Sequence, residues 1–269
     1  MARRNCRIVV KLITRRVSVS KRIYCLIKIF DSEEYAKAFL DTGEIFCRAF
    51  EEFKNIDDGN RRGDRFEGAS QWFQPKDVKI TLSARNKNDE ILHTVNIEES
   101  DLAGPVISQP ALFDGFNAFC MHAVAIEDFE ESYSTEDQKN ILKAKINRSI
   151  ARQTKIDPQC EDDFGDYAVV IYRVERFIEA VVSHAEHNNR KIWHGLVEYF
   201  DPETFTGSFN GIEAIFRKSK TYSHQNEFRF VFKANNKTQG AIKFNVGPLN
   251  EIAFMGPLKD IISGLEIKI

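Results

Sequence analysis

The amino-acid sequence predicts an α+β fold, a single domain of mostly antiparallel, mixed sheet with flanking helices. Segments with the two-residue period of a β-strand outnumber those with the period of a helix, and the helices are interspersed among the strands without strict alternation. The chain of 269 residues is 42% hydrophobic and contains 22 Phe, which is enough for a substantial buried core. We therefore expect one domain over residues 22–269, preceded by a basic arm over residues 1–21.

Composition excludes several classes of protein. A membrane span needs about 18 to 20 consecutive apolar residues, and the sequence has no such run, so we expect no contact with a membrane. The five cysteines are odd in number and form no C-x-x-C pair, which predicts reduced thiols, no metal site and a cytoplasmic location. Residues 1–28 contain nine Lys and Arg and no acid, so a basic arm precedes an acidic body. Such an arm could contact nucleic acid or its own domain.

The first elements follow from local patterns. Residues 9–19 and 23–30 are rich in β-branched and aromatic side chains and predict two short strands. Asp31 begins a D-x-x-E capping pattern, which predicts a helix that Gly43 ends. Residues 44–53 are predicted to be extended.

Loops and strands dominate the next part of the chain. Residues 55–68 form a polar stretch with three Gly, which predicts a loop. Residues 72–98 alternate in hydrophobicity on either side of Asn86 to Asp89 and predict a hairpin. The nearly continuous apolar run over residues 117–126 predicts a strand buried on both faces.

The C-terminal half mixes both kinds of element. Thr135 is predicted to begin a helix that reaches residue 150, and residues 174–185 have the clearest helical period of the chain. Short strands are predicted at the remaining apolar segments, residues 167–172, 196–200, 225–232, 242–246, 252–254 and 265–269.

The strand from Gln225 to Phe232 carries the most informative pattern. Three Phe share one face and predict core packing, while an amide, a carboxylate and a guanidinium follow one another on the opposite face, at Gln225, Glu227 and Arg229. A face held rigidly by a buried strand suits a binding or catalytic site. A half-solvated strand whose Glu227 and Arg229 form ion pairs explains the same pattern.

Other candidate sites have simple structural alternatives. His184 and His187 have the spacing of metal ligands, but histidines are also favoured near helix C-termini. His122 with Cys120 could form a nucleophilic pair, or His122 could be a hydrogen-bonded core residue.

Asp64 and Glu67 lie in a loop with three Arg and flanking Gly. These residues could build a metal or phosphate site, or a self-neutralising surface loop.

Several motifs together resemble an uncharacterised bacterial family whose members often lie in mobile or phage-defence regions. The resemblance covers residues 22–255, and its most specific part is a late K-x-x-x-Y-x-x-Q-x-E-x-R strand, here Lys218 to Arg229. The other matching segments are Ile23-Tyr-Cys-Leu, Gly43-Glu-Ile-Phe with Arg48, residues 62–68, Phe119-Cys-Met, residues 164–171 and Val197-Glu-Tyr199.

More distantly, the order of strand, helix, G-x-x-F strand and late Gln-x-Glu strand resembles the mono-ADP-ribosyltransferase toxins. The resemblance implies NAD as substrate, with Glu227 stabilising the ribosyl cation and Gln225 positioning the acceptor. It also implies that phosphates or the nicotinamide ribose are held by four further residues, Arg48, Tyr24, Tyr222 and Arg229.

We therefore expect an NAD-dependent ADP-ribosyltransferase-like effector that modifies RNA or protein in phage defence or toxin–antitoxin conflict. An antitoxin or chaperone would be its partner. The alternatives are a non-catalytic phage-sensing or binding protein, in which Glu227 and Arg229 form a structural ion pair, and a metal-dependent nuclease that uses Asp64 and Glu67.

Overall fold

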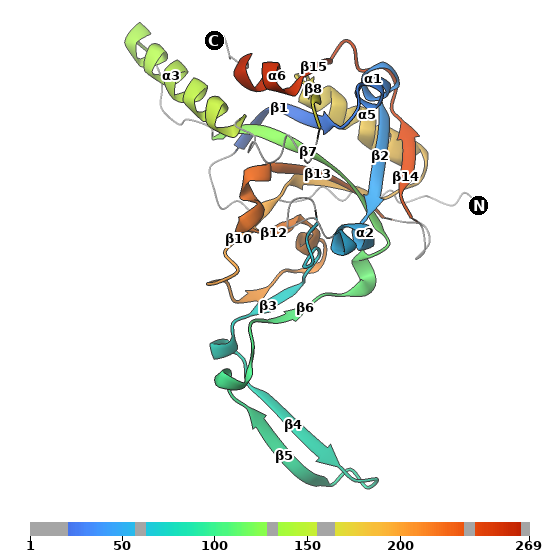
Figure 1. Ribbon diagram of the computed structural model, residues 1–269, viewed down its shortest axis with the longest axis vertical. Helices are drawn as coiled ribbons and strands as arrows, with labels where there is room; N and C mark the ends of the chain where they lie inside the picture. The colour runs from blue at the N-terminus through green and yellow to red at the C-terminus, as the bar shows by residue number, and fades with distance from the viewer. Residues whose placement is uncertain (1–20, 57–62, 128–133, 155–164, 234–239, 265–269) are drawn as a thin grey trace, which may run out of the picture.

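The computed structural model describes residues 21–56, 63–127, 134–154, 165–233 and 240–264. These residues form an α+β domain that combines open, mainly antiparallel sheets with helices, as the sequence predicts (Figure 1). No helix in this part of the chain is long and apolar enough to cross a membrane. The predicted strands over residues 9–19 and 265–269 lie outside the described residues, as do residues 1–20 of the predicted basic arm over residues 1–21.

The main sheet is organised around its longest strand, β7 (Phe116–Glu127). One edge of β7 pairs with β1 (Lys21–Phe30) and β2 (Glu44–Ala49), and the other edge pairs with β13 (Glu227–Lys233). The outer strands are β8 (Tyr167–Ile171) and β15 (Ala253–Pro257) beyond β1, β9 (Ile192–Leu196) beyond β13, and β14 (Ile242–Asn245) beyond β2. All of these pairings are antiparallel, which confirms the predicted sheet.

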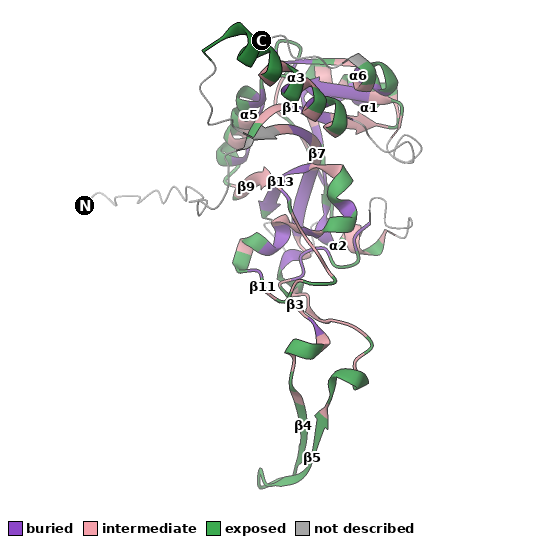
Figure 2. Cartoon of the chain, turned by 90° about the vertical axis from the view of Figure 1, so that its left-hand side faces the viewer, coloured by how far each residue is buried: buried purple, intermediate pink, exposed green. Residues whose placement is uncertain are grey.

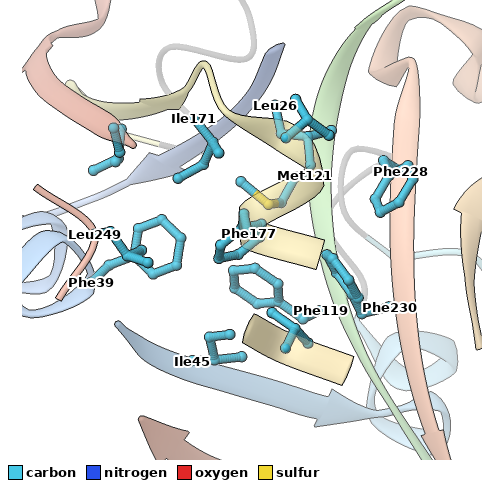
Figure 3. Packing of buried hydrophobic residues seen from close by; sticks show 14 of the residues in the cluster. Leu26, Phe39, Ile45, Phe119, Met121, Ile171, Phe177, Phe228, Phe230 and Leu249 are labelled. Carbon is cyan, nitrogen blue, oxygen red and sulfur yellow. The ribbon is translucent and has the colours of Figure 1, made fainter. Parts of the chain in front are cut away.

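Helices cover both faces of this sheet. On one face, α1 (Glu33–Thr42) and α5 (Val174–His187) bury aromatic and aliphatic side chains against Phe119, Phe228 and Phe230 (Figure 3). On the other face, α3 (Glu136–Gln153) and α6 (Leu258–Gly264) pack on a smaller cluster of apolar residues. The three Phe of β13 are at most 2% exposed, so their predicted role in the core is confirmed.

Smaller elements lie below β13 in Figure 1, and one of them, β12 (Arg217–Ser219), supplies Lys218 to the cluster of charged residues described in the next section. A parallel pair joins β10 (Glu198–Phe200) to β12 (Arg217–Ser219), and a three-stranded sheet joins β11 (Gly207–Ser208), β3 (Gln71–Phe73) and β6 (Val106–Ser108). Short 3-10 helices precede or follow these strands in the chain, η1 (Pro75–Asp77), η2 (Glu99–Asp101), η3 (Ala111–Phe113), η4 (Gly211–Phe216) and η5 (Lys220–Gln225).

The predicted hairpin extends away from the rest of the molecule. It consists of β4 (Ile80–Arg85) and β5 (Ile91–Ile97), which pair only with each other among the described strands. Figure 2 shows it exposed along almost its whole length.

Local capping explains where the predicted helices begin and end. Ser32, one residue after the predicted Asp31, caps α1, and its hydroxyl accepts a hydrogen bond from the Tyr35 N–H. The Thr135 hydroxyl accepts the Gln138 N–H at the start of α3, as predicted. Gly43 ends α1 with φ of 64°, and a Cβ there would lie 2.3 Å from the Gly247 carbonyl oxygen. Glycine is therefore required at Gly43 both by its backbone conformation and by the space around it.

Three expectations about strand boundaries are wrong. The extended segment stops at Ala49, and α2 (Phe50–Asn55) follows, because Phe50 turns into an apolar cluster below β13. The predicted strand over residues 196–200 is two strands, β9 and β10, which break at Val197, where the N–H donates to the Glu227 carbonyl.

The third concerns the start of β13. Lys220–Gln225 forms η5, and Asn226 has φ of 40°, so β13 begins at Glu227. Gln225 therefore does not share a strand face with Glu227. The polar face of β13 is also not solvated, because Glu227 and Arg229 are both buried.

Candidate functional site

Charged side chains gather inside the protein where β13 begins. They come from three segments far apart in sequence: the turn over residues 63–68, strand β12, and the η5–β13 junction. Five of these charged residues are nearly inaccessible to solvent: Asp64, Glu67, Lys218, Glu227 and Arg229. We call them the charge cluster. Charges in such a place persist only when each is paired and hydrogen-bonded.

Arg229 is the centre of the charge cluster. Its Nε donates to Glu227 Oε1 at 2.6 Å, and its Nη1 and Nη2 donate to the two carboxylate oxygens of Glu67 at 2.7 and 3.3 Å. Nη1 also donates to the Ile215 carbonyl at 2.6 Å, and the guanidinium lies 5.5 Å from the centre of the Phe50 ring. With two carboxylates, a carbonyl and an aromatic ring around it, and with 2% of its surface exposed, Arg229 is not accessible to an external phosphate.

Lys218 binds the other side of Glu227. Its ammonium lies 3.4 Å from Glu227 Oε2 and 2.9 Å from Gln225 Oε1. It also lies 4.5 Å from the centre of the Tyr222 ring, within the range of a cation–π contact. Each oxygen of Glu227 therefore faces a cation, and Gln225 and Glu227 converge on one ammonium although they do not share a strand face.

The turn over residues 63–68 covers the charge cluster. Tyr222 donates from its hydroxyl to the Gly63 carbonyl at 2.9 Å. Asp64 Oδ1 accepts the Phe66 N–H at 2.9 Å, and the Glu67 carbonyl accepts from Gln109 Nε2 at 2.7 Å. Within this turn Gly63, Asp64, Glu67 and Gly68 are buried, whereas Arg65 and Phe66 are exposed. The buried Asp64 and Glu67 therefore do not belong to a self-neutralising surface loop, which was one of the two interpretations of their sequence, and residues 57–62 lie outside the described residues.

Burial and charge act against each other on the ionisation of the cluster. Burial alone would raise the pKa of the Glu227 carboxyl, but Arg229 and Lys218 outweigh it and hold that pKa well below its usual range. Burial alone would lower the pKa of the Lys218 ammonium, but the charges of Glu227 and Glu67 outweigh it and raise that pKa. Glu227 and Lys218 are therefore charged at neutral pH.

Asp64 is the least compensated carboxylate of the cluster. Burial first, and then the nearby charge of Glu67, raise its pKa to about 6. It lines a small pocket together with Lys218 and aromatic side chains that include Trp72 and Phe200. The volume of this pocket is about 10 Å³, which is the space of one water molecule and far below that of a nucleotide site.

A second lysine approaches the cluster from the main sheet. Lys28 of β1 donates to the Cys120 carbonyl at 2.9 Å and lies 4.8 Å from the centre of the Phe119 ring. Burial lowers the pKa of its ammonium, and the charge of Glu227 is among the influences that oppose this. Burial also raises the pKa of the Cys120 thiol, so this group is not a thiolate nucleophile at neutral pH.

Two residues that the toxin resemblance assigns to NAD lie elsewhere. Tyr24 packs with the apolar cluster under α3 and α6, on the face of the sheet opposite to Phe119 and Phe230. Arg48 is exposed on β2. Of the residues that the toxin resemblance assigns to a site, the structure brings together Gln225, Glu227, Tyr222 and Arg229. Asp64 and Glu67, predicted separately as a metal or phosphate site, lie in the same cluster.

The histidines have structural surroundings. Both ring nitrogens of His122 contact backbone carbonyls, at Gln225 and Gln153, and burial lowers the pKa of its imidazole. His184 stacks on the Phe244 ring at 4.4 Å, and His187 bonds the Ser183 carbonyl. No group of three or more His, Cys, Asp or Glu in the described part of the chain could hold a metal ion.

Sequence reasoning named two members of the site only as part of a motif or a segment. Lys218 opens the K-x-x-x-Y-x-x-Q-x-E-x-R pattern, and its position four residues before Tyr222 was the available signal. Tyr199 accepts the Glu227 N–H at its hydroxyl oxygen, 2.9 Å away, and nothing in its local sequence indicated that contact.

Comparisons of the chain with family models, with curated proteins and with solved structures find no match. The fold and the charge cluster are therefore the basis for a functional proposal.

Proposed function

We propose that this protein acts by binding a macromolecular partner and that the charge cluster is a structural core, not a catalytic centre. The main observation in support is that the charge cluster is closed to solvent and to ligands. Glu227 is 5% exposed, and each of its carboxylate oxygens lies against a cation of the protein itself.

A transferase that displaces nicotinamide needs its carboxylate beside the ribose hydroxyls in the transition state. In this protein that position is filled by Lys218 and Arg229, and the adjoining pocket has room for about one water molecule. Because Lys218 and Arg229 already neutralise the Glu227 carboxylate in a fixed geometry, the carboxylate is suited to holding segments of the fold together. Arg229 links Glu227 to Glu67, and Glu67 lies 162 residues from Arg229 in sequence.

The surface of the protein supports a binding role. Eleven large hydrophobic side chains are exposed among the described residues, and four of them lie on the β4–β5 hairpin, Leu82, Ile91, Leu92 and Val95. Exposed apolar side chains gathered on one element are typical of interaction surfaces. We assign the hairpin as the contact surface of the binding function.

Transfer of label from NAD to a cell extract tests this proposal. We expect no transfer from the wild-type protein. The contradicting result is transfer that Glu227→Gln abolishes and that the matched change at an exposed carboxylate, Glu213→Gln, leaves intact.

An NAD-dependent ADP-ribosyltransferase is the second candidate. The observation in its favour is that Gln225 and Glu227 meet at one ammonium, so the two side chains lie on the same small site. For NAD to enter, Lys218 would have to withdraw and the turn over residues 63–68 would have to open. The label-transfer assay decides between the two candidates, because only the transferase requires Glu227 to contact the substrate.

The proposed biological setting comes from the sequence resemblance. A role in phage defence or toxin–antitoxin conflict, with a phage component, RNA or an antitoxin as partner, is a prediction for either candidate. The nuclease alternative receives least support, because Glu67 is tied to Arg229 by two hydrogen bonds.

A further inference from the structure

We propose that His122 is a pH-sensitive clamp, which fixes the backbone before β13 when its imidazole is protonated and releases that backbone when the imidazole is neutral. The clamp acts on the peptide between Gln225 and Asn226, where η5 leads into the charge cluster. It operates in a binding protein and in a transferase alike, because it moves the backbone of the protein and requires no ligand.

His122 joins two helix ends that come from different parts of the chain. Its Nε2 lies 2.6 Å from the carbonyl oxygen of Gln153, the last residue of α3. Its Nδ1 lies 2.9 Å from the carbonyl oxygen of Gln225, the last residue of η5. Carbonyls at the end of a helix have no partner within that helix, so they depend on a donor from elsewhere.

The two carbonyls can both be satisfied only by a charged ring. A carbonyl oxygen accepts hydrogen bonds and donates none, whereas a neutral imidazole has one N–H and one nitrogen without hydrogen. The protonated ring of His122 donates to both oxygens. The neutral ring leaves one oxygen facing a nitrogen lone pair at hydrogen-bonding distance, and that contact is unfavourable.

The Gln225 carbonyl is the one that the neutral ring releases. The contact with Gln153 is the shorter of the two, and the Gln153 side chain holds the end of α3 independently. Its Oε1 accepts the Ala125 N–H at 2.8 Å, and its Nε2 donates to the Ser149 hydroxyl at 3.0 Å. Asn226, by contrast, has φ of 40°, a left-handed conformation that is less favourable for Asn than for Gly. Without the bond to His122 the peptide before Asn226 rotates to relieve it.

Rotation of this peptide acts on the charge cluster. Gln225 Oε1 accepts a hydrogen bond from Lys218 at 2.9 Å, so movement of Gln225 weakens that contact. On the other side of Asn226, its own carbonyl accepts the Ala123 N–H at 2.7 Å and stays in place. The released state therefore loosens the amide that faces Lys218 and leaves Glu227 in the sheet.

The surroundings of the ring set the pH range of the clamp. Burial lowers the pKa of the His122 imidazole below its ordinary value, the two carbonyls oppose this, and the charge of His224 on η5 adds to the lowering. The neighbours in the sheet are the uncharged Ile27 of β1 and Glu227 of β13, whose carboxylate is bound by cations of the charge cluster. Protonation therefore occurs on the acid side of neutrality. The clamped state has two acceptors and binds the proton more tightly than the released state, so acid closes the clamp.

Nuclear magnetic resonance of the full chain between about pH 4 and 8 tests the clamp. We expect the His122 ring to carry protons on both nitrogens at the acid end and on Nε2 alone at the alkaline end. Hydrogen exchange at the Asn226 amide, corrected for its intrinsic rate, should be about tenfold slower in the protonated form, which corresponds to one charged hydrogen bond. The Phe230 amide in the middle of β13 reports opening of the whole fold and should not show this gain.

Two substitutions separate the clamp from other effects of pH. Asn226→Gly keeps the left-handed backbone without help from His122, so the tenfold difference should shrink to less than about twofold. His224→Gln removes the neighbouring imidazole and should leave the difference in place. The proposal is overturned if the His122 ring keeps one protonation state across the whole range, or if exchange at Asn226 does not follow the His122 titration. An undiminished difference in Asn226→Gly, or its loss in His224→Gln, overturns it as well.

Discussion

Replacement of Arg229 by Met tests whether the charge cluster stabilises the fold. Met keeps a long unbranched side chain but removes the guanidinium from between Glu67 and Glu227. Glu67 then loses both of its bonds, at 2.7 and 3.3 Å, while Glu227 keeps Lys218 at 3.4 Å. Two buried carboxylates, Glu67 and Glu227, are then left with Lys218 as the remaining cation of the charge cluster.

The expected loss is large. Removing one partner of a buried ion pair costs about 3–5 kcal/mol, because the remaining charge is left unpaired. In the Arg229→Met variant the free energy of unfolding at pH 7 should fall by that amount. Part of the loss should return at lower pH. A buried, unpaired carboxyl has a raised pKa, so it binds a proton in the folded state first, and its destabilising effect grows as the pH rises.

Urea unfolding at several pH values measures this effect. A neutral triple variant, Glu67→Gln with Arg229→Met and Glu227→Gln, should recover most of the loss, because no unpaired charge remains. Arg176→Met at an exposed position of α5 serves as the control and should change stability by less than about 0.5 kcal/mol. A loss below about 1 kcal/mol for Arg229→Met, with an unchanged denaturant slope, would refute the reasoning.

Three further predictions concern single positions. Asp64 has a folded-state pKa raised to about 6, so its contribution to stability is present below about pH 4 and is lost as the pH rises through 6. Asp64→Asn should remove a pH dependence on the order of 3 kcal/mol from unfolding curves between pH 4 and 7, and unchanged curves would contradict the burial argument. Phe230→Ala in the core should cost about 3–5 kcal/mol in urea unfolding, against less than about 1 kcal/mol for the exposed Phe254→Ala. Gly43→Ala should lower the melting temperature, because its φ is 64° and its Cβ would meet the Gly247 carbonyl, and a gain in stability would contradict the observed backbone.

Local patterns predicted much of the fold. The alternating Phe of β13, the cap at Thr135, the start of α1 within one residue of the predicted cap, and the hairpin turn at residues 86–89 all depend on neighbours within a few residues. The segment over residues 50–53 was misassigned, because Phe50 and Phe53 are three residues apart, which is the spacing of one face of a helix and not of a strand. Phe50 packs in the cluster that includes Val231 of β13.

The site was predictable only in part. The K-x-x-x-Y-x-x-Q-x-E-x-R pattern predicted that Gln225, Glu227 and Arg229 belong to one site, and they lie together in the structure. Their partners could not be inferred, because Glu67 lies 162 residues from Arg229 and no local period links such positions. The left-handed backbone at Asn226 also shifted Gln225 off the strand, and a single non-glycine residue in that conformation has no strong signature in one sequence.

The free energy of unfolding of Glu227→Gln is the most direct test of the claim that Glu227 is structural. Glu227 accepts from Arg229 at 2.6 Å and faces Lys218 at 3.4 Å, so its loss leaves two buried cations undercompensated. We predict a decrease of about 3 kcal/mol relative to the wild-type protein at pH 7. A variant as stable as the wild type would contradict the account, since it would mean that the carboxylate is not needed to hold the fold together.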